Sequence, residues 1–141
     1  MVLGDYDAVQ ALWLSTPGMG LNDVDDSPEG IGRHLRRNPT TCFVAEEDGR
    51  IVGVILAGHD GRRGFIYHAC VARSLWDGHL GTRLVDAALG ALRAEGITKV
   101  ALVVFGRNER GNGFWERLGF RERSDLVYRD KALVEVGRID T

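Results

Sequence analysis

A chain of 141 residues that is 44% hydrophobic and 27% charged is long and apolar enough to bury the core of one domain. Its 18 basic and 20 acidic residues nearly cancel, and no block of Lys or Arg provides a face that would follow a nucleic-acid backbone. No apolar stretch approaches the length of a membrane span, and the first residues lack a signal-peptide pattern. We therefore expect no nucleic-acid or membrane partner, and a soluble, cytoplasmic single domain over residues 1–141.

Two helices are predicted near the amino terminus. Residues 4–14 carry apolar side chains at helical spacing behind Asp5, a typical N-cap residue. A second helix is predicted to begin at Ser27, because Pro28 then takes the first helical position and an acidic residue follows in the first turn. This helix is expected to run to about Arg37, where an Asn-Pro pair stops it.

Three strands are predicted next, arranged as an antiparallel meander. Residues 42–45 and 51–57 are rich in β-branched and apolar side chains, and the Glu-Asp-Gly run at 47–49 is typical of a hairpin turn. Asp60-Gly61 predicts a second turn, and residues 65–71 predict the third strand.

The two cysteines, Cys42 and Cys70, lie within these apolar runs. Their spacing is not that of a metal site or of a redox motif. We expect buried free thiols and no metal ion.

The most regular helical pattern lies in the second half of the chain and ends at Gly96, a typical left-handed cap. Its apolar residues recur at positions 80, 84, 85, 88, 89 and 92. Residues 99–105 then predict a buried strand, and residues 113–117 predict a short helix that ends at Gly119. Residues 120–133 predict one or two closing strands.

A loop with two glycines, Gly78 and Gly81, lies between the strand 65–71 and the long helix. This order can aim backbone N–H groups and the positive end of a helix dipole at a phosphate. Glycine loops before helices are also common without a ligand. The loop alone therefore leaves phosphate binding and a simple connection both open.

Three segments stand in the order found in a known family: residues 60–71 (DGRRGFIYHACV), 81–85 (GTRLV) and 108–120 (NERGNGFWERLGF). They resemble the GNAT N-acetyltransferase family, in particular its small bacterial single-domain members. The resemblance extends over about residues 4–133 and implies an α/β fold. Its central sheet is mixed and mostly antiparallel, with helices on both faces and a splayed cofactor cleft. The family's usual first strand is absent, so either this chain lacks it or a partner supplies that edge.

The resemblance implies an N-acetyltransferase that uses acetyl-coenzyme A (acetyl-CoA) as co-substrate. The acetyl group would pass to an amine of a small molecule or peptide by direct attack in a ternary complex. The pantetheine arm would lie between strands 65–71 and 99–105 and pair with the backbone of Ala69, Cys70 and Val71. The other implied cofactor contacts are the diphosphate loop and two residues on the pantetheine side: Trp76, Asp77, Gly78, His79, Leu80, Gly81, Thr82, Asn108 and Phe114.

Several departures from the family pattern fall on functional positions. The family loop reads Arg/Gln-x-x-Gly-x-Gly/Ala, whereas here Trp76 replaces the basic or amide residue and His79 replaces the first glycine. Asp77 adds a negative charge where the diphosphate would approach, and a lost charge-assisted contact costs about 1.5–3 kcal/mol. Trp115 stands at the position of the tyrosine that protonates the leaving thiolate, and indole is not an acid near neutral pH.

His68 is the candidate general base, because an imidazole titrates near neutral pH, and Tyr67 is a candidate substitute acid. A purely structural role in the sheet suits His68 equally well. Neighbouring residues of a strand face opposite sides, so only one of the two is expected to point at the cleft. The acidic cluster of Asp23, Asp25 and Asp26 either attracts an ammonium group or is simply solvated.

Two functions from different classes stay open. The intact strand segment and Asn108 favour an active N-acetyltransferase. The altered loop and Trp115 favour the alternative, a GNAT-fold protein with a degenerate cofactor loop that acts as a non-catalytic binding or regulatory module. No sequence code identifies the acceptor amine, and the sequence is compatible with a homodimer.

Overall fold

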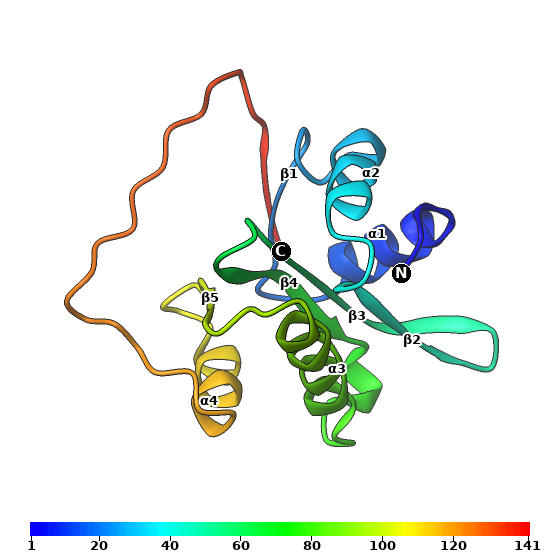
Figure 1. Cartoon of the computed structure of the whole chain (residues 1–141). Coiled ribbons are helices and arrows are strands. Elements are labelled where there is room, and N and C mark those ends of the chain that lie inside the picture. The colour runs from blue at the N-terminus through cyan, green and yellow to red at the C-terminus, as the bar shows by residue number, and fades with distance from the viewer.

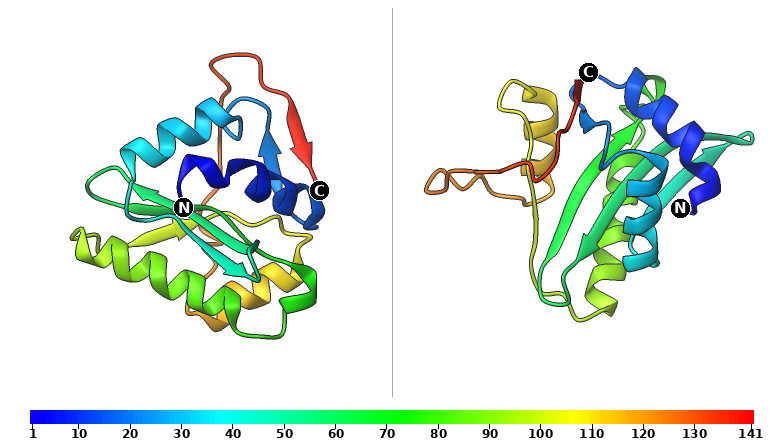
Figure 2. Two further views of the ribbon diagram at one scale, coloured as in Figure 1. Left: turned by 90° about the vertical axis from the view of Figure 1, so that its right-hand side faces the viewer. Right: turned by 90° about the horizontal axis from the view of Figure 1, so that it is seen from above.

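A computed structural model describes all 141 residues and contains a four-stranded sheet with helices on both faces (Figures 1 and 2). The strands are β2 (Phe43–Glu47), β3 (Arg50–His59), β4 (Gly64–Val71) and β5 (Val100–Leu102), in that spatial order. The pairs β2–β3 and β3–β4 are antiparallel, whereas β4–β5 is parallel. The predicted α/β fold with a mixed, mostly antiparallel sheet is confirmed.

Two helices cover one face of this sheet (Figure 2, left). Helix α1 (Tyr6–Ser15) follows the 3-10 turn η1 (Leu3–Asp5), and α2 (Pro28–Arg37) begins where the sequence predicts. The Ser27 hydroxyl accepts a hydrogen bond from the amide of Gly30 at 3.1 Å, which satisfies one free N–H group of the first turn.

The other two helices lie in the second half of the chain. Helix α3 (Leu80–Ala94) covers the opposite face, and α4 (Glu109–Arg117) begins earlier than the predicted 113–117. The earlier start has a local cause, because Asn108 Oδ1 accepts a hydrogen bond from the amide of Gly111 at 2.9 Å and so caps the helix. No helix is both long and apolar enough to cross a membrane.

Left-handed residues mark the turns that the sequence predicts. Asp48 and Gly49 join β2 to β3 with φ of 49° and 75°, as a two-residue hairpin turn requires. Gly96 ends α3 with φ of 82°, and Gly119 follows α4 with φ of 87°. Glycine suits these two positions because it has no Cβ to clash in this conformation.

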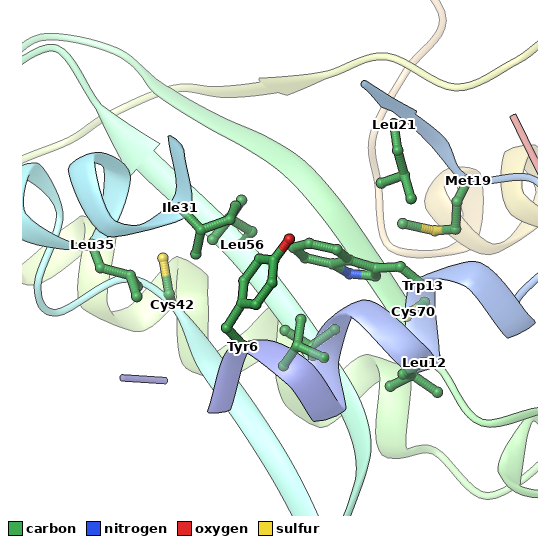
Figure 3. Packing of buried hydrophobic residues seen from close by; sticks show 12 residues of the cluster. Tyr6, Leu12, Trp13, Met19, Leu21, Ile31, Leu35, Cys42, Leu56 and Cys70 are labelled. Carbon is green, nitrogen blue, oxygen red and sulfur yellow. The ribbon is translucent and has the colours of Figure 1, made fainter. Parts of the chain in front are cut away.

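Two hydrophobic cores lie on opposite faces of the sheet, because successive residues of β3 point to opposite sides. Val54 and Leu56 belong to the cluster of 12 buried residues under α1 and α2 (Figure 3). Ile55 and Ala57 belong to the cluster of 9 buried residues under α3. Trp13 projects from α1 into the first cluster and is fully buried. Burial on both faces explains why β3 is a continuous apolar run rather than an alternating one.

The predicted closing strands at 120–133 are wrong. Residues 121–137 form an exposed arm without secondary structure, which leaves the body after α4 and returns to it (Figures 1 and 2). The arm ends in β6 (Arg138–Asp140), which pairs antiparallel with β1 (Gly20–Asn22) as a second, unpredicted sheet. A strand needs a neighbouring edge, and the arm lies away from the sheet, so its apolar residues do not pair. The predicted strand 99–105 is likewise shorter, since β5 has only three residues.

Candidate functional site

The sheet is open between β4 and β5. The two strands pair only from Gly64 with Val100 to Ile66 with Leu102. Beyond that point β4 continues to Val71, whereas β5 has ended. The splayed arrangement predicted for these strands is therefore present, and the second half of β4 has no strand beside it on this edge.

Backbone groups on this edge can be assigned from the register. The amide of Ala72 donates to the carbonyl of Val52 at 2.7 Å, and antiparallel pairs alternate in which edge their backbone groups face. The peptide groups of Cys70, opposite Val54, therefore bond to β3. Those of Ala69 and Val71 face the split instead. The Val71 carbonyl accepts the Trp76 indole N–H, so the free groups on this edge are the amide and carbonyl of Ala69 and the amide of Val71.

The loop before α3 is built around a left-handed histidine. His79 has φ of 61° and precedes the first helical residue, so it takes a conformation that usually requires glycine. His79 thus provides a left-handed residue at the position of the first family glycine. The first amides of α3, at Leu80, Gly81 and Thr82, have no carbonyl one turn earlier to bond to. They add to the positive end of the helix dipole.

The two loop glycines have different surroundings. A Cβ at Gly81 would lie 3.2 Å from the Phe114 ring, so this glycine lets α3 and α4 approach each other closely. A Cβ at Gly78 would meet only the carbonyl oxygen of Leu75, at 3.5 Å. Space beside Gly78 is thus open to a ligand, whereas Gly81 is needed for packing.

Arginines surround Trp76 in this loop. Its indole N–H donates to the carbonyl of Val71 at 2.8 Å, which fixes the ring against the end of β4. The guanidinium carbon of Arg110, on α4, lies 4.4 Å from the centre of the indole ring, and that of Arg73 lies 5.7 Å away. Arg110 Nη2 also lies 3.2 Å from Asp77 Oδ1. The negative charge of Asp77 is therefore paired within the protein.

His68 forms a close pair with Asp26 on the α1 side of the sheet. Nε2 of His68 lies 2.6 Å from Asp26 Oδ1, and the side chains are only 12% and 10% exposed. The other carboxylate oxygen accepts the amide of Asn22 at 2.8 Å, and the Tyr6 hydroxyl donates to the Asp26 carbonyl at 2.7 Å. The Trp13 ring stands edge-on to His68, 5.0 Å between centres. The imidazole is thus held from two sides.

The expectation that Tyr67 and His68 face opposite sides is wrong. The register of β3 and β4 shifts at Tyr67, which has no opposing residue and forms a β-bulge. The Tyr67 ring lies 5.2 Å from that of His34 on α2, so it shares the helix-covered face with His68. Burial, helped by the charge of Asp60, raises the pKa of Tyr67. Its phenol stays protonated near neutral pH.

The predicted residues of α4 are engaged within the protein. Asn108 caps the helix, as described above. The Trp115 ring packs edge-on against Phe114 and Phe120, at 5.0 and 5.2 Å between centres. It contributes to the core on the α3 side. Through the contact with Gly81, Phe114 joins this packing to the start of α3.

The partnership of His68 with Asp26 was not predicted. The acidic cluster was the available signal, but spacing could not show which aspartate reaches the strand. Asp23 accepts the amide of Gly137, and Asp25 accepts a neighbouring side-chain amide. Only Asp26 is buried against His68.

Comparison with known proteins shows which family the chain belongs to. A model of the acetyltransferase (GNAT) family matches residues 6–120. An acetyltransferase of Pectobacterium atrosepticum is 31% identical over 93% of this chain and 91% of its own. The PaiA N-acetyltransferase of Thermoplasma acidophilum, solved with coenzyme A, shares the fold with a TM-score of 0.71 at 14% identity, covering 86% of each chain. AAC(6')-Iy, solved with a bisubstrate analogue, has a TM-score of 0.69 at 18% identity, covering 94% of this chain and 95% of its own. With the family's motifs, split sheet and sequence matching across most of its length, the chain belongs to the acetyltransferase (GNAT) family.

Proposed function

We propose that this protein transfers an acetyl group from acetyl-CoA to an amine of a small molecule or peptide. The observation that carries the proposal is the open edge of β4 at Ala69 and Val71, with the buried His68–Asp26 pair on the adjoining residue. Two proteins of the same fold support it, because PaiA was solved with coenzyme A and AAC(6')-Iy with a coenzyme A-linked acetylneamine analogue.

The residues present fit the proposed co-substrate. The amide and carbonyl of Ala69 and the amide of Val71 can pair with the pantetheine amides as a missing strand would. Free amides at the start of α3 and the open space beside Gly78 suit a diphosphate. Acetyl-CoA would supply a thioester carbonyl as the electrophile. The protein's task is then to align an amine with that carbonyl and remove its proton.

His68 is proposed as the general base, with Asp26 as its positioning residue. In this role Nε2 of His68, which lies against the carboxylate, donates to Asp26, and Nδ1 is the nitrogen that accepts a proton. Nδ1 receives the proton of the attacking amine. The amine nitrogen forms a bond to the thioester carbonyl carbon, the C–S bond breaks, and the thiolate leaves with the electron pair.

Steady-state kinetics with aminoglycoside and peptide amines tests the assignment. We expect His68→Gln to lower kcat by about 10²–10⁴-fold, because general base assistance is lost. Asp26→Asn should lower kcat and shift its pH profile, because an amide cannot fix the tautomer of the imidazole. Asp25→Asn is the matched control and should change kcat less than twofold, since Asp25 does not touch His68.

Unchanged turnover in a folded His68→Gln variant would contradict the base assignment. Binding of acetyl-CoA without transfer to any amine would favour the binding or regulatory module instead. A thermal shift gives the binding result, because a ligand at a hundred times its Kd adds about 2.7 kcal/mol to the free energy of unfolding. No shift at millimolar acetyl-CoA would contradict the proposed function.

A further inference from the structure

The loop before α3 has a tryptophan at position 76, and a cation from another element lies beside it. The Arg110 guanidinium carbon lies over the Trp76 ring, 4.4 Å from its centre. Arg110 belongs to the first turn of α4, far along the chain from the loop. The fold therefore brings an arginine from another element to the loop.

We propose that Arg110 binds a phosphate group of the co-substrate, in place of a basic residue in the loop itself, and that Asp77 holds Arg110 while the site is free. This inference rests on the proposed function, since it names a residue that recognises the same ligand. A guanidinium binds phosphate through two parallel hydrogen bonds, which gives it direction as well as charge. Asp77 competes for the same donors.

The geometry suits an exchange of partners. The Asp77 side chain is 99% exposed and that of Arg110 is 56% exposed, so their ion pair lies in solvent and is weak. A phosphate offers more charge than one carboxylate and is further favoured by the dipole of α3. Stacking on the indole keeps the guanidinium near the loop when it leaves Asp77.

The aromatic platform is itself anchored. The Trp76 indole donates to the Val71 carbonyl, and Val71 is the last residue of β4. One chain of contacts thus joins α4, the loop and the open edge of the sheet. Trp76 has a positive role in this arrangement, because an arginine at position 76 could not make the same platform for Arg110.

Calorimetry with coenzyme A and the full chain tests the proposal. Arg110→Gln should weaken binding by about tenfold or more, because a charge-assisted contact is lost. Asp77→Asn should tighten binding, and the gain should be smaller in the Arg110→Gln background, because no guanidinium is then released. Arg107→Gln is the matched control, since it removes the same charge from a side chain that contacts Asp140 and the Phe105 ring instead.

A second experiment identifies which phosphate group Arg110 contacts. If the Arg110→Gln penalty is the same with 3′-dephospho-coenzyme A, the contact is to the diphosphate. If the penalty disappears, the contact is to the 3′-phosphate, and Arg110 is still a phosphate-binding residue. Circular dichroism of each variant confirms that the fold is intact.

Two failures can be told apart. If the natural chain binds coenzyme A but Arg110→Gln binds within twofold of it, or Arg107→Gln weakens binding equally, Arg110 has no specific role and the proposed function stands. If the natural chain binds no coenzyme A at millimolar concentration, both proposals fall together.

Discussion

Burial raises the pKa of the Cys70 thiol to about 12, although this residue lies on the strand that borders the split. The pKa of Cys42 is raised by the same cause. Both side chains are buried in the core under α1 and α2 and stay protonated at neutral pH. Neither thiol can therefore accept an acetyl group covalently, which is consistent with direct transfer to the amine.

His34 makes stability depend on pH. Burial lowers its pKa below the ordinary value, while its Nε2 lies 3.0 Å from the Ala57 carbonyl. Because the folded state resists protonation, the unfolded chain binds more protons below pH of about 6.5. We expect the free energy of unfolding to fall as the pH drops below that value and to level off below the folded pKa. Urea denaturation at a series of pH values measures it.

The control for this prediction is His34→Gln, whose side-chain amide can still donate to the Ala57 carbonyl. As the pH falls from 7.5 to 5, the free energy of unfolding of the natural chain should fall relative to that of the variant. A constant difference over that range would show that His34 does not carry the pH dependence.

At the level of elements, two glycines near the junction of α3 and α4 are expected to have different roles, Gly81 in packing and Gly78 in ligand binding. Gly81→Val should lower the free energy of unfolding by about 1–3 kcal/mol, because the added methyl groups would clash with Phe114. Gly78→Val should leave stability within about 0.5 kcal/mol, as for an exposed site. It should nevertheless weaken binding of acetyl-CoA, because it fills the space proposed for the diphosphate. Denaturation and calorimetry on the same two variants measure both effects.

Gly90→Ala is the control at this level, since it lies within α3 with open space around it. It should raise stability by about 0.5–1 kcal/mol through helix propensity and leave binding unchanged. Equal loss of binding in the Gly81 and Gly78 variants, with no loss of stability in either, would contradict these different roles of the two glycines.

Helix and strand boundaries were predictable where a local cause sets them. Ser27 caps α2 with its own hydroxyl, and Asp48-Gly49 forms the hairpin turn through its left-handed backbone. The start of α4 was missed, because three glycine and asparagine residues conceal the helical pattern that follows the Asn108 cap. Bulges are harder still, since the one at Tyr67 depends on how two strands pair.

Considered as a whole, the molecule is a packed body with one exposed arm. Trypsin should first cut within residues 121–137, after Arg129 or Lys131, because the arm has no secondary structure and proteases need an extended, accessible chain. Arg50, exposed but paired within the β2–β3 hairpin, should be cut later. Mass spectrometry of early fragments measures the order. Resistance of the arm would show that it pairs with the sheet in solution.

The sequence by itself determined the α/β class, the main helices and strands up to α4, and membership of the acetyltransferase family. Caps, turns and apolar periodicity are local, so the helices and strands could be predicted from short windows of residues. The family was indicated by the resemblance of three segments that stand in the family's order.

Only the tertiary structure decided which side chains meet. Asp26 reaches His68 across 42 positions, and Arg110 reaches Asp77 across 33. The arm at 121–137 has strand-like residues without a strand, because no edge of the sheet lies beside it. Pairing between distant residues depends on the path of the whole chain, and no local pattern encodes that path.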